Sequence, residues 1–129
     1  MAYVLIVMVL ALLQFAAFGM AVGRARHRYG VSAPAVTGHA LFERYFRVQM
    51  NTLEQLVMFL PAVWLFAQFI SPHWAAALGA VYLLGRSLYF ASYVKAPATR
   101  RMGYLLSIVP TLCMLGGVLF EAVRMLRLS

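Results

Sequence analysis

The sequence predicts an all-α integral membrane protein, folded as a bundle of four transmembrane helices. Of its 129 residues, 64% are hydrophobic and only 11% are charged, whereas ordinary soluble domains are roughly 45–50% apolar. Four apolar stretches approach the roughly 20 residues that a helix needs to cross a bilayer. A water-exposed surface cannot be built from this composition. We therefore expect one four-helix transmembrane domain over residues 1–129.

The first predicted helix covers residues 1–22, which carry no charged side chain. No Lys or Arg precedes this apolar run, so it lacks the charged start of a secretory signal peptide and is expected to be a retained span. The turn-forming residues Gly30, Pro34 and Gly38 come soon after it. We expect the first loop to comprise these residues and the basic residues before them, Arg24, Arg26 and Arg28.

The other helices are expected at about residues 40–70, 73–94 and 99–127. Ser71-Pro72 should end the second helix, and a short basic turn containing Lys95 and Arg100 separates the third from the fourth. Because loops rich in Lys and Arg favour the cytoplasm, both basic connections are predicted to be cytoplasmic. Both termini would then face the other side of the membrane.

The formal charge of +8 does not indicate a nucleic-acid-binding protein. The basic residues flank apolar spans, where the positive-inside rule and anionic lipid headgroups explain them. The only cysteine, Cys113, excludes an intramolecular disulfide. The three histidines lack the spacing of metal ligands, so we expect no metal site.

Arg44, Arg47, Asn51 and Glu54 form a polar stripe on the second helix, within an arc of roughly 80°. Charged side chains at membrane depth turn toward a bundle interior or a wet cavity. The stripe therefore indicates either a binding pocket or a structural ion pair between Arg47 and Glu54. Gln49 points about 140° away from Arg44, which suits either a site between subunits or an interhelical hydrogen bond.

Tyr82, Arg86, Tyr89 and Tyr93 form a second stripe, on the third helix, within about 60°. Tyr93 lies near a helix end, where tyrosines also serve as interfacial belt residues. Together the stripes predict a pocket rich in arginine, with Glu54, Asn51 and tyrosine hydroxyls. Arginine binds carboxylates with two parallel hydrogen bonds and a glutamate pairs with ammonium. The pocket thus suits an anion that also carries an amine.

Four sequence blocks carry a family resemblance: PAVTG at 34–38, FERYFRVQMNTLE at 42–54, LGAVYLLGRSLYFASY at 78–93 and RRMG at 100–103. They resemble blocks of the membrane-associated proteins in eicosanoid and glutathione metabolism, the MAPEG family, and occur in family order. The resemblance is to microsomal glutathione transferases and leukotriene-forming synthases.

The resemblance implies a homotrimer that binds glutathione, as a co-substrate, at each subunit interface. It assigns one subunit's share of the site to Arg47, Asn51, Glu54, Tyr89, Tyr93 and Arg100, with Arg26 and Gln49 reaching it from the neighbour. Arg100 would be the catalytic residue. It would stabilise the glutathione thiolate, since a free thiol with a pKa of about 8.5 is mostly protonated at neutral pH.

The implied activity is a membrane-bound glutathione transferase, with glutathione peroxidase as a side activity. The thiolate would attack a lipophilic electrophile or reduce a lipid hydroperoxide that enters from the bilayer.

Leukotriene-forming relatives have a second arginine where this chain has His27, and other members have an aromatic residue at the position of Gln55. These departures favour general detoxification over one dedicated lipid substrate.

Two alternatives remain open at this point. A non-catalytic member that binds lipid or glutathione would retain the same stripes. A small multidrug exporter would use Glu54 as its proton-coupling carboxylate, although the nearby arginines would neutralise the charge that attracts cationic drugs. The short chain, rich in alanine and arginine, suggests a bacterial inner membrane, with the glutathione site facing the cytoplasm.

Overall fold

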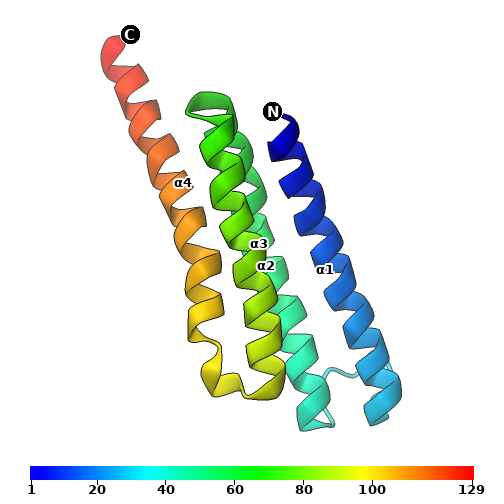
Figure 1. Ribbon diagram of the computed structural model, residues 1–129. Coiled ribbons are helices and arrows are strands. Elements are labelled where there is room, and N and C mark those ends of the chain that lie inside the picture. The colour runs from blue at the N-terminus through cyan, green and yellow to red at the C-terminus, as the bar shows by residue number, and fades with distance from the viewer.

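The computed structural model describes residues 1–129 and is entirely helical (Figure 1). Each of its four long helices is long and apolar enough to cross a membrane. This confirms the all-α class and the expected number of candidate spans. The elements in chain order are α1 (Ala2–Tyr29), α2 (Ala40–Phe69), α3 (Pro72–Lys95), the short 3-10 turn η1 (Pro97–Thr99) and α4 (Arg101–Leu128).

α1 extends beyond the predicted span, and its end corrects the expected first loop. Arg24, Arg26 and Arg28 lie within the helix rather than in the loop, because Arg and Ala are good helix formers and only the hydrophobic span ends at residue 22. The helix stops at Gly30, which adopts the left-handed conformation at φ 70° and donates its N–H to the Arg26 carbonyl. The last turns of α1 can therefore project beyond the apolar core of a bilayer.

Local capping residues fix the starts of α2 and α3. His39 Nδ1 accepts a hydrogen bond from the Leu41 N–H at 3.1 Å, and Ser71 Oγ accepts one from the Trp74 N–H at 3.2 Å. Pro72 follows as the first residue of α3, where its missing N–H costs nothing. α4 begins slightly later than predicted, because residues 97–99 form the 3-10 turn instead of the first helical turn.

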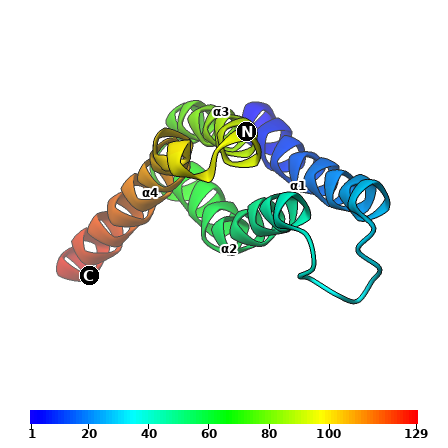
Figure 2. The same ribbon diagram turned by 90° about the horizontal axis from the view of Figure 1, so that it is seen from below.

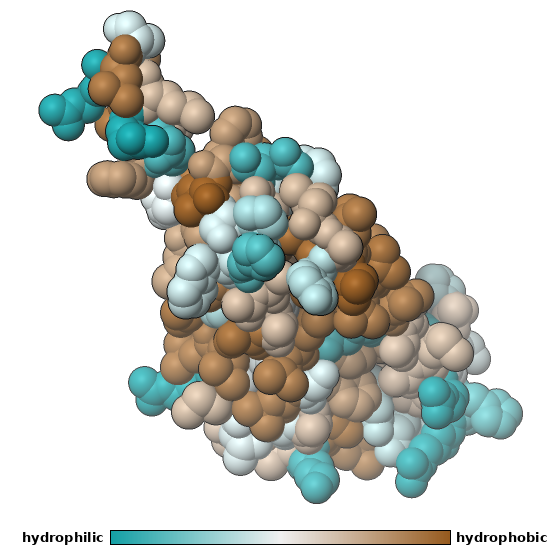
Figure 3. Space-filling view, turned by 45° about the horizontal axis from the view of Figure 1, so that its top comes forward, coloured by the Kyte–Doolittle hydropathy of each residue, from teal (hydrophilic) through white to brown (hydrophobic).

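α2 and α3 form the centre of the bundle, and α1 and α4 lie on opposite sides of this pair (Figure 2). Both termini lie at one end of the molecule, while the connections α1–α2 and α3–α4 lie at the other (Figure 1). The basic residues at the end of α1 and those that follow α3 therefore share one end, as the sequence predicts. The C-terminal half of α4 extends away from the other helices (Figures 1 and 3).

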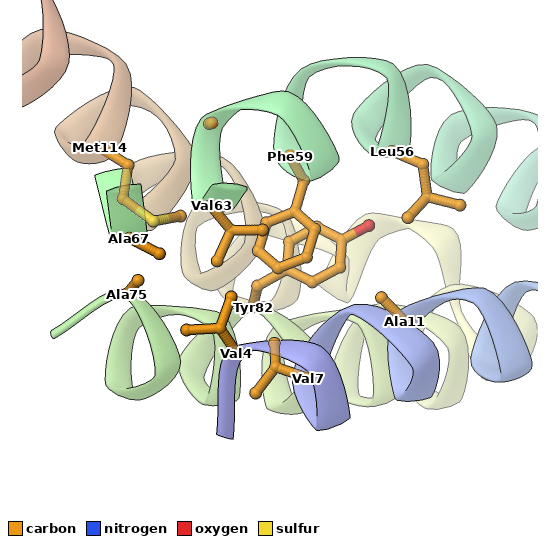
Figure 4. Packing of buried hydrophobic residues seen from close by; sticks show 11 residues of the cluster. Val4, Val7, Ala11, Leu56, Phe59, Val63, Ala67, Ala75, Tyr82 and Met114 are labelled. Atoms are coloured by element: carbon orange, nitrogen blue, oxygen red, sulfur yellow. The ribbon is translucent and has the colours of Figure 1, made fainter. Parts of the chain in front are cut away.

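The apolar core is small, and much of the apolar surface faces outward. Only 27 of the 129 residues are buried, and apolar side chains cover most of the middle of the molecule in Figure 3. In the largest buried cluster the rings of Phe59 and Tyr82 stack with their centres 3.8 Å apart (Figure 4). A surface of this kind suits lipid, because a helix in a bilayer gains nothing by hiding leucine from its surroundings.

Two glycines bring α3 and α4 into close contact. A Cβ atom added at Gly85 would lie 2.7 Å from the carbonyl carbon of Leu106, and one added at Gly103 would collide with the backbone of Tyr89. Small residues of this kind permit the close helix approach that stabilises membrane bundles. They also fix the distance between the two helices that form one wall of the pocket described next.

Candidate functional site

A pocket of about 610 Å³ opens between α2, α3 and the start of α4, at the end of the bundle that carries the basic connections. It contains arginines from two elements and no acidic side chain. α2 supplies one wall and α3 a second, while the turn after α3 supplies the rim. The lining residues are Arg47, Asn51, Tyr89, Tyr93, Ala98, Arg100, Arg101 and Tyr104.

The arginines of this pocket have few partners of their own. Arg47 is exposed and makes no hydrogen bond within the chain. Arg100 is also exposed, and its Nη1 donates to the Pro97 carbonyl at 2.8 Å, which holds the side chain at the rim. With Arg101 beside them, these guanidinium groups create a positive site whose free donors can bind carboxylate or thiolate.

Arg86 lies behind the pocket and joins its walls through hydrogen bonds. It is fully buried. Its Nη1 donates to Asn51 Oδ1 at 2.9 Å and to Thr52 Oγ1 at 3.2 Å on α2, and its Nε donates to Ser107 Oγ at 3.0 Å on α4. The guanidinium carbon also lies 4.3 Å from the centre of the Tyr89 ring, a cation–π distance. Arg86 thereby orients two lining residues, Asn51 and Tyr89.

Five of the predicted site residues come together in this pocket: Arg47, Asn51, Tyr89, Tyr93 and Arg100. The centres of the Tyr89 and Tyr93 rings lie 5.5 Å apart. Glu54 does not line the pocket. It is exposed, and the expected alternative of an Arg47–Glu54 ion pair is not formed, since the one salt bridge of the chain joins Arg124 to Glu121 at 2.8 Å.

Arg26 and Gln49 lie away from the pocket, near the seam between α1 and α2. Arg26 Nη1 donates to the Ala35 carbonyl at 2.6 Å, and its guanidinium stacks over the Phe42 ring at 4.9 Å. Gln49 packs against Gly19, where an added Cβ would lie 3.0 Å from the Gln49 amide nitrogen. Neither residue reaches the pocket of its own chain, in agreement with the predicted direction of Gln49.

Two residues of the predicted stripes serve the fold instead. Arg44 Nη1 donates to the carbonyls of Val94 and Lys95, both at 3.0 Å, and so caps the C-terminus of α3. A cation at this position also complements the helix dipole. Tyr82 stacks on Phe59 in the apolar core, and its hydroxyl has no partner.

The sequence analysis missed three lining residues, Ala98, Arg101 and Tyr104. Tyr104 follows Arg100 by four residues, and its N–H donates to the Arg100 carbonyl at 3.0 Å. Residues four apart share a helix face, so this spacing was a usable signal. Arg101 lies in the RRMG block at 100–103, but nothing in its spacing assigns it to the pocket. No group of His, Cys, Asp or Glu side chains able to hold a metal ion occurs in the structure.

Comparison with known proteins agrees with this architecture. Residues 3–120 match the model of the MAPEG family. The chain is 40% identical to human microsomal glutathione S-transferase 2, over 87% of this chain and 78% of that protein. It is 36% identical to guinea pig (Cavia porcellus) leukotriene C4 synthase, over 92% and 84% respectively. It is 50% identical to an uncharacterised protein of Synechocystis, over 82% and 77%. The chain belongs to the MAPEG family.

Proposed function

We propose that this protein is a membrane-bound glutathione transferase with glutathione peroxidase side activity. The observation that carries the proposal is the pocket in which Arg47, Arg100 and Arg101 surround Asn51 and tyrosine hydroxyls without a neutralising acid. The similarity to a glutathione S-transferase and a leukotriene C4 synthase supports it. Glutathione carries carboxylates at both ends, and arginines bind carboxylates with directed hydrogen bonds.

In this proposal Arg100 stabilises the glutathione thiolate. Lowering the thiol pKa by about two units from about 8.5 takes roughly 2.7 kcal/mol of differential stabilisation, which we assign to the Arg100 guanidinium. The thiolate then attacks an electrophilic carbon, a carbon–sulfur bond forms, and the leaving group departs with its electron pair. With a lipid hydroperoxide, two glutathione molecules are oxidised to a disulfide while the peroxide becomes an alcohol and water.

We further propose that three copies of the chain assemble and complete one another's sites. Glu54 projects from the middle of α2 without a partner, and an unpaired carboxylate facing lipid is costly. In a trimer it would face the neighbouring subunit and pair with the ammonium group of glutathione. Arg26 and Gln49, which face away from their own pocket, would reach the adjacent one.

The membrane is proposed to be a bacterial inner membrane, with the site toward the cytoplasm and the second substrate arriving from the lipid.

Conjugation of glutathione to a chlorinated nitroaromatic, in which the thiolate displaces chloride, tests the activity. The wild-type protein should conjugate glutathione to this substrate. At pH 7 the rate of Arg100→Ala should be about twentyfold lower, because a thiol whose pKa returns to about 8.5 is mostly protonated. The rate of the variant should recover as the pH rises. Calorimetry should show that glutathione still binds, and Arg127→Ala at the far end of α4 is the matched control. Unchanged turnover in Arg100→Ala would reject its role.

A non-catalytic member that binds lipid or glutathione is the alternative outcome. Such a protein would show no conjugation with any aromatic electrophile. If millimolar glutathione also failed to raise the melting temperature, the pocket would not be a glutathione site, because a ligand specific for the folded state must stabilise it.

A further inference from the structure

A second pocket, separate from the proposed glutathione site, lies beside α1 at the same end of the molecule. Its volume is about 630 Å³. We call it the α1 groove. It is lined by Ala17, Phe18, Ala21, Arg24, Ala25, Arg28, Tyr29, Tyr45 and Phe90. The α1 residues come from about three turns of one helix, and at about 1.5 Å per residue they span roughly 18 Å along it.

The floor of the α1 groove is rigid and aromatic. Phe90 of α3 stacks on Phe18 of α1, with ring centres 4.8 Å apart. It also meets the ring of Tyr45 of α2 edge-on, with ring centres 5.8 Å apart. One turn deeper into the span, Gln14 Nε2 donates to the Leu83 carbonyl and to Ser87 Oγ, both at 3.0 Å, which holds α1 against α3. Seven of the nine residues that line the groove are hydrophobic, and these aromatic and hydrogen-bonding contacts join its three helices.

The open end of the α1 groove carries two cations without counterions. Arg24 and Arg28 are exposed and share one side of α1. Neither forms a salt bridge, and the chain has only three acidic residues, none of which lines the groove. Because these arginines lie in the last turns of α1, beyond the apolar run, we expect them at the level of lipid headgroups, with Ala17 and Ala21 at the level of acyl chains.

The α1 groove does not belong to the surface proposed to complete a neighbour's site. Arg26 lies between Arg24 and Arg28 in the sequence, and at about 100° per residue it points to the opposite side of α1. Its contacts with Ala35 and Phe42 lie on that opposite side. The groove and the surface that carries Arg26 therefore lie on different sides of α1.

We propose that the α1 groove is a specific binding site for an anionic phospholipid. Arg24 and Arg28 hold the headgroup phosphate and its second anionic or hydroxyl group, and one acyl chain lies along Ala17 and Ala21 over Phe90. Charge complementarity selects the headgroup, since a zwitterionic lipid brings a cation together with its phosphate and so adds no net negative charge to balance the two guanidinium groups. The proposal is independent of whether the chain is an enzyme.

Native mass spectrometry of the detergent-solubilised full chain tests this site. The protein is equilibrated with equal amounts of dioleoyl phosphatidylglycerol and dioleoyl phosphatidylcholine. Two arginines that each contribute a factor of roughly five should give about twenty-five-fold preference for the anionic lipid. The variant Arg24→Gln/Arg28→Gln should lose that preference, whereas Lys95→Gln/Arg127→Gln, with the same change of charge outside the groove, should keep it. If the double variant fails to fold, each single variant should lose about fivefold.

A second pair of variants tests the acyl chain. Ala21→Phe fills the groove while both arginines remain, and it should reduce retention of phosphatidylglycerol, whereas Ala122→Phe on the exposed surface of α4 should not. Glycerophosphate, which has the headgroup charge without chains, should not displace the bound lipid. Equal retention of both lipids by the wild type, or unchanged retention in the Arg24/Arg28 or Ala21 variants, would overturn the proposal. Displacement by glycerophosphate would reduce the site to a simple anion site.

Discussion

Arg86 is the residue on which the shape of the candidate site depends most. It joins three helices through Asn51, Thr52 and Ser107. Replacement by methionine keeps most of the volume but removes these bonds. Hydrogen bonds from charged groups contribute about 1.5–3 kcal/mol each in water and less in membrane proteins. We therefore expect Arg86→Met to lose about 2–4 kcal/mol of unfolding free energy, measured by thermal unfolding in detergent.

The same substitution separates a supporting role from a purely stabilising one. Asn51 and Tyr89 lose their anchor in Arg86→Met, so the KM for glutathione should rise more than kcat falls. Lysine should not restore KM, because an ammonium group cannot reproduce the planar set of donors. Arg127→Met, at an exposed position, is the control. A variant with unchanged melting temperature and unchanged KM would contradict this role.

At the scale of residues, helical periodicity correctly predicted the face of the helix on which a side chain lies. It did not predict what the side chain contacts at its level along the helix. It placed Arg47 and Asn51 on one face and Gln49 on another, as found. It could not distinguish Arg44, which caps the end of α3, or Tyr82, which lies in the apolar core, from the true lining residues of their stripes. An angle around a helix axis says nothing about what packs at each level along it. That information comes only from the neighbouring helices.

At the scale of elements, the contact between α3 and α4 decides whether the pocket exists. Gly103→Ala places a Cβ atom against the backbone of Tyr89, which cannot move as a flexible side chain can. Overpacking of this kind costs about 1–3 kcal/mol. We expect a lower melting temperature and weaker glutathione binding, since separating α3 from α4 pulls Ser107 away from Arg86 and moves the start of α4 away from the α3 wall of the pocket.

Gly116→Ala provides a control within the same helix. Nothing lies within 4 Å of a Cβ atom added there, so the gain in helix propensity should stabilise α4 by about 0.5–1 kcal/mol. The expected result is a change of opposite sign in the two variants. If both glycine substitutions raised the melting temperature, the close packing of α3 on α4 would be refuted.

The helices themselves were predictable because composition and turn residues determine them almost alone. Four apolar stretches gave four helices, and the two basic connections lie at one end (Figure 1). The end of α1 was wrong because charge marks where a span ends, whereas Gly30 marks where the helix ends. The α1 groove was not predictable, because its walls come from three helices whose lateral order the sequence does not state.

At the scale of the whole molecule, the residues assigned to the site by the family resemblance lie on two separate surfaces of the chain. The pocket opens between α2, α3 and α4, while Arg26 and Gln49 lie at the α1–α2 seam. Two different surfaces that meet head to tail generate a closed ring when the rotation between copies permits it. In the proposed trimer each pocket would therefore meet the Arg26 surface of the next subunit, which gives a quantitative test of the assembly.

Coexpression of two inactive variants should restore activity if sites form between subunits. Arg100→Ala damages the pocket, and Arg26→Ala/Gln49→Ala damages the surface proposed to complete the neighbour's pocket. In randomly mixed trimers, about a quarter of the interfaces pair an intact pocket with an intact complementing surface. Conjugation should therefore recover to about one quarter of the wild-type rate per subunit. Coexpression of Arg100→Ala with Arg47→Ala, both in the pocket, should recover nothing. If the two mixtures are equally inactive although copurification of differently tagged chains proves mixing, each site is contained within one chain and the shared-site trimer is refuted.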